Sequence, residues 1–136
     1  MKRSRLMISV AFALFVLLAS AVAQTGAIKA TIPFDFTIAK QTLPAGEYKV
    51  AVQGTMLLLT RLDGTNSAYV HYYLSAHAKD VSPRLIFHRY GNRSFLSQAR
   101  ITAAAHELIA SPREIEYART DKQEQVVVLA SALQQN

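Results

Sequence analysis

The chain has 136 residues and no cysteine, and its 15 Lys and Arg outnumber its 9 Asp and Glu. This length predicts one domain, and the lack of cysteine excludes disulfides and lipid attachment through a cysteine. Taking Lys2, Arg3 and Arg5 out of the 15 basic residues leaves 12 against 9 acidic ones, a net charge of +3 spread along the chain, which excludes the clustered basic stripe of a nucleic-acid-binding protein.

The N-terminal segment is typical of a secretory signal peptide. It comprises a basic start (Lys2, Arg3, Arg5), an apolar stretch predicted to be helical (Leu6–Ala19) and a small-residue cleavage motif (Ala21–Ala23). We expect cleavage between Ala23 and Gln24 and export of residues 24–136 as a single domain. An uncleaved membrane anchor is the alternative, because the apolar stretch approaches the roughly 18–20 residues that span a bilayer. Ser9 and Ser20 interrupt that stretch and favour cleavage.

Two alternating stretches around a turn open the exported domain. From Ile28 to Ile38 the even positions are apolar and the odd positions are mostly polar, which is typical of a strand with one buried face. Leu43-Pro44-Ala45-Gly46 combines the fixed φ of proline with the permissive φ of glycine and predicts a turn. The alternation resumes from Tyr48 to Val52 and predicts a second strand.

Further strands are predicted along the rest of the chain. They are Met56–Leu62, Ala68–Ala78, Leu85–Tyr90, Ser94–Ile101 and Gln125–Ala130, with Gly91-Asn92 as a two-residue hairpin turn. Met56–Leu62 is apolar on both faces, which predicts a central strand. A loop at Lys79–Pro83 would make a hairpin of the two strands that flank it.

One short helix is predicted before the last strand. Ser111-Pro112-Arg113-Glu114 forms a capping box, in which the serine oxygen accepts the Glu114 amide while the glutamate side chain reaches back. The helix is expected from Pro112 to about Arg119. Thr102–Ala110 is rich in Ala, Glu and Leu and predicts either a further helical turn or two, or a loop. Together these patterns predict an all-β, mainly antiparallel fold, a small barrel or sandwich of about seven strands.

Three motifs follow one another along the chain: IPFDF at 32–36, LPAGEY at 43–48 and LIFHRYGNRSFLSQ at 85–98. In these motifs the chain resembles a family of small exported bacterial proteins of unknown function, in which a signal peptide precedes an IPFDF strand, an LPAGxY turn and an RYG hairpin followed by FLS. The resemblance extends over residues 28–116 and implies export and the β fold, but no catalytic residue. The chain departs from the family at Thr102–Ala110, where the family has a loop containing Gly and Pro.

No metal-binding set of histidines is evident. His71 and His77 share a face of one predicted strand, but six residues at about 3.3 Å each separate them by roughly 20 Å, too far for one metal ion. Neither His88 nor His106 has a second ligand at a suitable spacing. We therefore predict no metal and no cofactor.

No catalytic residue is predicted either, because the sequence has no cysteine, no G-x-S-x-G motif and no implied Ser, His and acid set. Asp35 and Glu47 would approach each other if their strands pair, as an acid and a base require. The favoured interpretation is that Asp35 bonds turn amides and that Glu47 is solvated.

A candidate interaction surface is more evident than a catalytic site. Tyr69, His71 and Tyr73 share one face of a predicted strand, where exposed rings can stack on sugar rings or dock a partner. Ordinary cross-strand pairing or burial under the helix is the alternative. Arg84, Arg89, Arg93 and Arg100 surround the hairpin turn and would suit an anionic polymer or lipid headgroup, with a solvated hairpin as the default. The candidate surface comprises Tyr69, His71, Tyr73, Arg89 and Arg93.

The leading functional hypothesis is a non-catalytic exported domain, periplasmic or extracellular, that binds an envelope or extracellular component. The alternative is a small barrel that holds an apolar small molecule, suggested by the two-sided apolar strand Met56–Leu62. A hydrolytic enzyme is the third. No nucleic-acid partner is expected, and contact with the membrane is expected only through the signal peptide before its cleavage.

Overall fold

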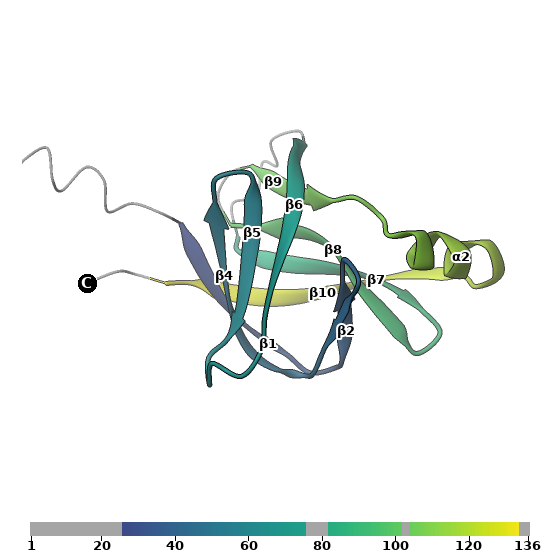
Figure 1. Cartoon of the computed structure of the whole chain (residues 1–136), viewed down its shortest axis with the longest axis horizontal. Coiled ribbons are helices and arrows are strands. Elements are labelled where there is room, and N and C mark those ends of the chain that lie inside the picture. The colour runs from purple at the N-terminus through teal and green to yellow at the C-terminus, as the bar shows by residue number, and fades with distance from the viewer. Residues whose placement is uncertain (1–25, 76–81, 102–103, 134–136) are drawn as a thin grey trace, which may run out of the picture.

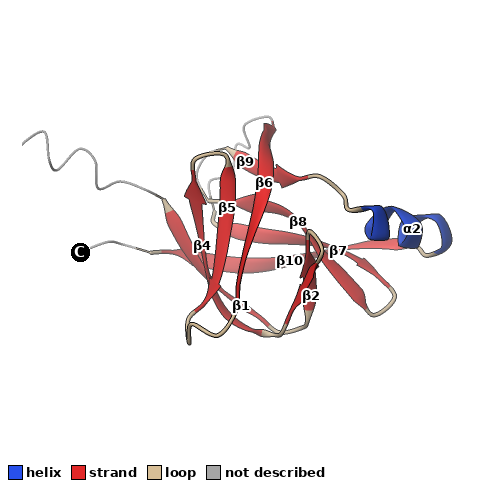
Figure 2. Cartoon of the chain, viewed as in Figure 1, coloured by secondary structure: helices blue, strands red, loops and turns tan. Residues whose placement is uncertain are grey.

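A computed structural model describes residues 26–75, 82–101 and 104–133, and in these residues the fold is a closed, mainly antiparallel β-barrel. Its elements are β1 (Ala27–Ile32), β2 (Phe36–Ile38), β3 (Gln41–Leu43), β4 (Gly46–Gln53), β5 (Met56–Arg61), β6 (Ser67–Ser75), β7 (Arg84–Tyr90), β8 (Arg93–Arg100), β9 (Ala105–Leu108), α2 (Pro112–Thr120) and β10 (Gln123–Ala132). Figure 2 shows how strongly strands predominate. The predicted all-β class is confirmed, and of the two architectures left open the structure is the barrel.

Eight strands close the barrel in the order β1-β4-β5-β6-β9-β8-β7-β10, and β10 pairs back with β1. All of these pairings are antiparallel. In Figure 1, β4, β5 and β6 run across β7, β8 and β10, as two walls of the barrel, and α2 protrudes at the right-hand end. The predicted central strand at 56–62 is β5, which lies between β4 and β6.

One edge of β8 has two partners. Its C-terminal half pairs with β9, where Gln98 lies opposite Glu107, and its N-terminal half pairs in parallel with β2 at Phe95 and Thr37. The β2–β3 hairpin continues from there towards β6, and Gln41 Nε2 of β3 donates a hydrogen bond of 3.3 Å to the carbonyl oxygen of Ser67. Because β9 and the β2–β3 hairpin share this edge, the wall next to β6 is built from two separate segments of the chain.

The barrel interior is occupied by the protein's own side chains. The largest fully buried residues include Ile28 and Ile32 of β1, Tyr48 and Val50 of β4, Leu57 and Leu59 of β5, and Leu85 and Phe87 of β7. The ring of Phe36 packs edge-on against Tyr48 and Phe87, with centroid distances of 5.3 and 5.5 Å. Aromatic pairs of this kind contribute about 0.5–1.5 kcal/mol beyond their burial, so the aromatic cluster adds to the stability that the chain must obtain without disulfides.

The helix before the last strand is confirmed, and it packs on the outside of the barrel. Ser111 is its N-cap, and the Ser111 Oγ accepts the Glu114 amide over 3.2 Å. The ring of Tyr117 lies 6.0 Å from Phe95, and Phe95 lies 6.0 Å from Tyr90 on its other side. A small outer cluster of rings therefore fixes α2 to β7 and β8.

Two predicted elements differ from the structure. The strand expected over 28–38 divides into β1 and β2, because Pro33 has no N–H to donate to a ladder and ends the first strand. Residues 105–108, within the stretch expected to be helix or loop, form β9 instead. His106 lies opposite Leu74 on one side and Ala99 on the other, so pairing with two strands outweighs the helix propensity of this segment.

The hairpin expected from a loop at 79–83 is not formed by the described strands, because β6 pairs with β5 and β9 whereas β7 pairs with β8 and β10. The structure has more strands than the predicted total of about seven because the strand expected over 28–38 is divided in two and because β3 and β9 were not predicted. The predicted signal peptide, with its cleavage position between Ala23 and Gln24, lies outside the described residues, as does His77. Of the described residues, only α2 forms a helix, and it is too short and too polar to cross a membrane.

Candidate functional site

An open cleft of about 540 Å³ lies on the outer wall of the barrel, next to the segment that leads into α2. Its polar side chains come from five strands: Tyr73 of β6, His88 of β7, Ser97, Gln98 and Arg100 of β8, Glu107 of β9, and Gln125 of β10. Ile86 and Ile109 are among its apolar side chains. Volumes of roughly 300–1,000 Å³ are typical of small-molecule sites, so this cleft is large enough to hold a ligand.

Strand register explains why these residues meet. Tyr73 lies opposite Glu107, Glu107 opposite Gln98, and Gln98 opposite Ile86, across β6, β9, β8 and β7. Residues opposite one another in neighbouring strands point to the same face of the sheet. The four side chains therefore form one row across the outer wall, and the cleft lies over this row.

Glu107 is the centre of the hydrogen-bond network in the cleft. Gln98 Nε2 donates a bond of 2.9 Å to Glu107 Oε1, and Arg100 Nε donates a bond of 3.0 Å to Gln98 Oε1. Hydrogen bonds from the hydroxyls of Tyr73 and Ser75 also reach the carboxylate. The bond from Tyr73 is the main cause of the lowered pKa of Glu107, and it raises the pKa of Tyr73 in return. The carboxylate is thus ionised and held in place at neutral pH.

A second network connects the cleft to α2. His88 Nδ1 lies 3.1 Å from Oε1 of Glu114, and the Tyr90 hydroxyl donates to the same oxygen over 3.2 Å. Glu114 is buried, with a relative exposure of 5%, although it is a charged residue in the first turn of a helix. The capping box predicts that the Glu114 side chain reaches back to the N-cap, but in the structure its carboxylate contacts His88 and Tyr90 of the barrel.

A β-bulge places the consecutive residues Ser97 and Gln98 on the same face, in the cleft. The β7–β8 register shifts between Ile86 and Phe87, so Phe87 lies opposite Leu96 while Ile86 lies opposite Gln98. Ser97 is the extra residue between them. A bulge interrupts the regular alternation of side chains between the two faces, and here the consecutive residues Ser97 and Gln98 both line the cleft, while Leu96 and Ala99 on either side of them are buried.

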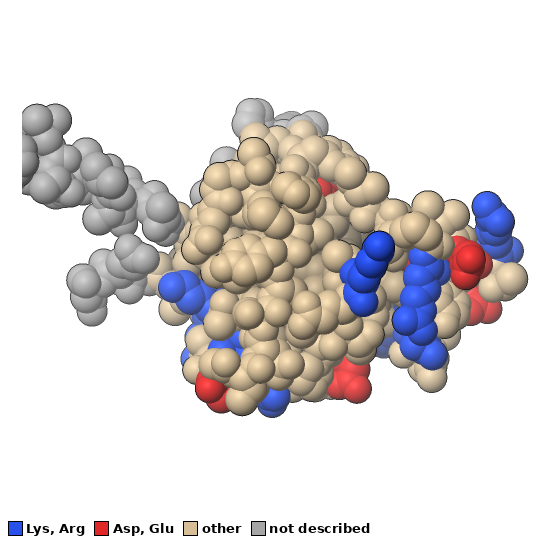
Figure 3. All heavy atoms as spheres, viewed as in Figure 1, with Lys and Arg blue, Asp and Glu red and all other residues tan. Residues whose placement is uncertain are grey.

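The aromatic part of the predicted interaction surface lies together on the outside of β6. Tyr69 is 56% exposed and Tyr73 is 50% exposed, and His71 between them is also exposed. Of these three, only Tyr73 lines the cleft. Figure 3 shows that the surface over β5, β6 and β9 is largely uncharged, whereas Lys and Arg gather towards α2.

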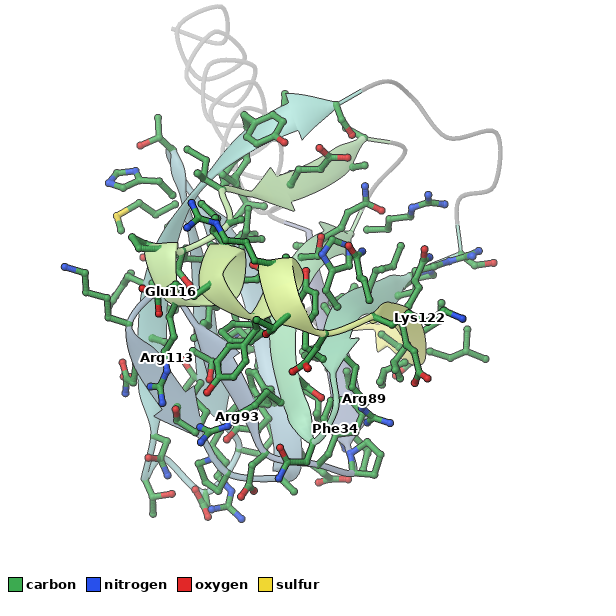
Figure 4. All side chains as sticks on the ribbon, turned by 90° about the vertical axis from the view of Figure 1, so that its right-hand side faces the viewer. Phe34, Arg89, Arg93, Arg113, Glu116 and Lys122 are labelled. Carbon is green, nitrogen blue, oxygen red and sulfur yellow. The ribbon has the colours of Figure 1, made fainter. Side chains whose placement is uncertain are left out.

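The two arginines of the predicted surface lie elsewhere and apart from these aromatic residues. The Arg89 guanidinium stacks over Phe34 at 4.7 Å, and the Arg93 guanidinium lies over Tyr117 of α2 at 5.7 Å. Figure 4, which looks onto α2, shows the Arg89–Phe34 pair below the helix. Of the four arginines that surround the Gly91-Asn92 turn in the sequence, Arg100 lines the cleft.

The other candidate residues have structural partners. Asp35 Oδ1 accepts the Ala45 amide over 3.0 Å, as expected for a carboxylate that bonds a turn, and Glu47 forms an ion pair of 3.8 Å with Lys29. His106 is buried against Tyr72, and burial lowers its pKa. Among the residues that the structure describes, no three His, Asp or Glu side chains converge as metal ligands.

Sequence reasoning missed Gln98, Glu107 and the His88–Glu114 pair. A glutamate inside a short alternating segment, AHEL, is the signal that would have placed Glu107 on an outer face if the segment had been interpreted as a strand. No sequence signal identifies the partner of His88, because 26 residues separate it from Glu114. Comparisons with protein-family models, curated proteins and solved structures gave no match to this chain, so the family resemblance stays a prediction.

Proposed function

We propose that the protein is an exported, non-catalytic binding domain and that the cleft on its outer wall is the ligand site. The observation that carries this proposal is the row Tyr73–Glu107–Gln98, extended by Arg100, whose polar groups are already fixed to one another in the free protein. Polar side chains that are ordered in advance lose little conformational entropy when a ligand binds. Export follows the predicted signal peptide and the resemblance to small exported bacterial proteins.

The cleft suits binding better than acid–base chemistry. A catalytic base needs a pKa near the working pH, whereas the hydrogen bonds to Glu107 lower its pKa. The barrel interior offers less support for a ligand site, because the rings of Phe36, Tyr48 and Phe87 occupy it. The proposal therefore places binding on the outside of the barrel, and the apolar-ligand barrel becomes the weaker alternative.

A hydrolytic enzyme is the second candidate, and one observation favours it. The buried carboxylate of Glu114 contacts Nδ1 of His88, and a histidine held this way can use its other nitrogen as a base. His88 and Ser97 line the same cleft. Turnover of p-nitrophenyl esters or glycosides that is lost in His88→Ala would favour this candidate over a binding domain.

Photo-crosslinking in the producing cells tests the binding proposal. p-Benzoylphenylalanine in place of Ile109, which is 76% exposed at the cleft, is expected to capture a specific adduct. The same group in place of Leu62, which is 47% exposed in the β5–β6 connection, is the control and is expected to capture none. Equal adducts at both positions, or an adduct at position 109 that survives Tyr73→Ala, would contradict the proposal.

A further inference from the structure

The charges of the cleft balance, and this sets the kind of ligand it accepts. Among the residues that line the cleft, one is basic (Arg100) and one is acidic (Glu107). His88 also lines the cleft, and its Nδ1 lies 3.1 Å from the buried carboxylate of Glu114, which is not among the lining residues. A site for an anion or a cation needs an excess of the opposite charge, so the balance favours a neutral ligand.

The cleft also offers donors and acceptors next to one another. The hydrogen bonds of the described residues use only Nε of Arg100, which leaves its two Nη groups for a ligand. Gln125 contributes a further amide to the lining, and Ser97 a hydroxyl. Each hydroxyl of a sugar both donates and accepts, so adjacent hydroxyls on a ring match planar amide, carboxylate and guanidinium groups placed side by side.

An apolar surface accompanies these polar groups. Tyr73 is half-exposed at one side of the cleft, and Ile109 is largely exposed at its rim. A pyranose ring has apolar C–H faces as well as hydroxyls, and an exposed aromatic ring can pack on such a face. A purely polar ion or a fully apolar ligand would leave one half of this lining unused.

On these grounds, and resting on the proposed function of the cleft, we propose that its ligand is a neutral saccharide, with Tyr73 packing on a sugar ring and Arg100 and Glu107 binding its hydroxyls. A peptide is less well matched. An extended peptide binds by adding a strand to a free sheet edge, but β8 lies between β7 and β9, and β9 lies between β6 and β8. The wall under the cleft therefore presents a sheet face and no edge.

The test uses the protein purified from its producing cells and NMR titration of its backbone amides. The probes are neutral di- to tetrasaccharides of hexoses and N-acetylhexosamines, with sulfated and uronic-acid oligosaccharides and a heptapeptide library as the other arms. A neutral saccharide is expected to cause saturable shifts at Gln98, Arg100 and Glu107. Binding by charged saccharides or peptides alone, or by no member of the panel, would overturn the proposal.

Two tyrosines on the same face of β6 provide a matched pair of variants. Tyr73 lines the cleft, while Tyr69 is similarly exposed and does not line it. Tyr73→Ala is expected to weaken saccharide binding about tenfold or more, because it removes the stacking ring. Tyr73→Phe keeps the ring but loses the hydroxyl bond to Glu107, so it should weaken binding less than Tyr73→Ala does. Tyr69→Ala should leave the affinity unchanged. Equal losses from Tyr69→Ala and Tyr73→Ala would refute the assigned role of Tyr73.

The outcomes separate this proposal from the one on which it rests. An adduct captured at position 109 in cells, together with no saccharide binding, would leave the cleft as a binding site and reject the saccharide. Saccharide shifts confined to residues outside the cleft would reject both the ligand position and the proposed site.

Discussion

Replacing Glu114 by Gln tests whether the buried carboxylate fixes α2 to the barrel. Glu114 Oε1 accepts from the Tyr90 hydroxyl over 3.2 Å and lies 3.1 Å from Nδ1 of His88. Both Glu114 and Tyr90 are buried, with exposures of 5% and 3%. Burial and the nearby charge of Glu114 raise the pKa of Tyr90, so the hydroxyl keeps its proton and remains a donor at neutral pH.

The expected loss follows from the type of hydrogen bond. Bonds to charged groups contribute about 1.5–3 kcal/mol, and neutral bonds about 0.5–1.5 kcal/mol. Glu114→Gln keeps the shape and one acceptor, so we expect it to lower the free energy of unfolding by about 1–2 kcal/mol. Glu114→Ala leaves the Tyr90 hydroxyl with only the longer contact to Gln123 at 3.5 Å. This substitution should lower the free energy of unfolding by about 2–4 kcal/mol.

Urea denaturation of the variants, followed by circular dichroism, measures these values. Glu116→Gln is the matched control, because Glu116 lies on the same helix, is exposed and carries the same charge. Its effect should stay within about 0.5 kcal/mol. A double-mutant cycle with Tyr90→Phe should give a coupling of about 0.5 kcal/mol or more. A loss in Glu114→Gln no larger than that in Glu116→Gln would refute the assigned role of Glu114.

Three further substitutions test other parts of the structure. Burial lowers the pKa of His106, so as the pH falls below about 6.5 the unfolded chain takes up the proton first and the folded protein loses stability. His106→Phe should reduce this loss, measured as the change in the urea midpoint between pH 7 and pH 5. An unchanged loss would contradict the lowered pKa of His106. Ser111→Ala removes the N-cap of α2 and should cost about 1 kcal/mol in the same assay, whereas no loss would mean that the cap is dispensable. Asp35→Ala removes the acceptor of the Ala45 amide and should lower the free energy of unfolding by about 0.5–1.5 kcal/mol. It should not reduce adduct formation at position 109, and loss of that adduct would connect this turn to the ligand site.

Local patterns in the sequence identify most of the strands and the helix. Alternation predicts β4 and β6 because one face of each lies against the core, and a stretch that is apolar on both faces predicts β5 as a central strand. Ser111 with Pro112 predicts the start of α2 because capping involves only neighbouring residues. The errors arise where distant partners decide the structure. Residues 105–108 contain good helix formers, yet two flanking strands make them β9.

The candidate site could not be predicted for the same reason. Tyr73, Gln98 and Glu107 belong to three strands whose order along the chain does not reveal that β9 inserts between β6 and β8. The shift at Ser97 changes the face that a residue occupies, and alternation alone gives no sign of it. Tyr73 was predicted as an interaction residue because an exposed aromatic ring on a strand is visible locally, but the residues that surround it are not.

The division of Glu107 and Glu114 into two roles is what makes the cleft suited to binding. Both are glutamates that hydrogen-bond to a tyrosine hydroxyl, but Glu114 is buried between α2 and β7, whereas Glu107 remains partly exposed in the cleft. Burial makes the loss of a partner costly, so Glu114 is expected to affect stability. Partial exposure leaves a carboxylate able to exchange water for a ligand hydroxyl at little cost, so substitution of Glu107 by Gln should weaken saccharide binding while changing the urea midpoint much less than Glu114→Gln does. If Glu107→Gln instead destabilised the fold as much as Glu114→Gln and left binding intact, the cleft network would be a structural support of β9 and not a recognition site.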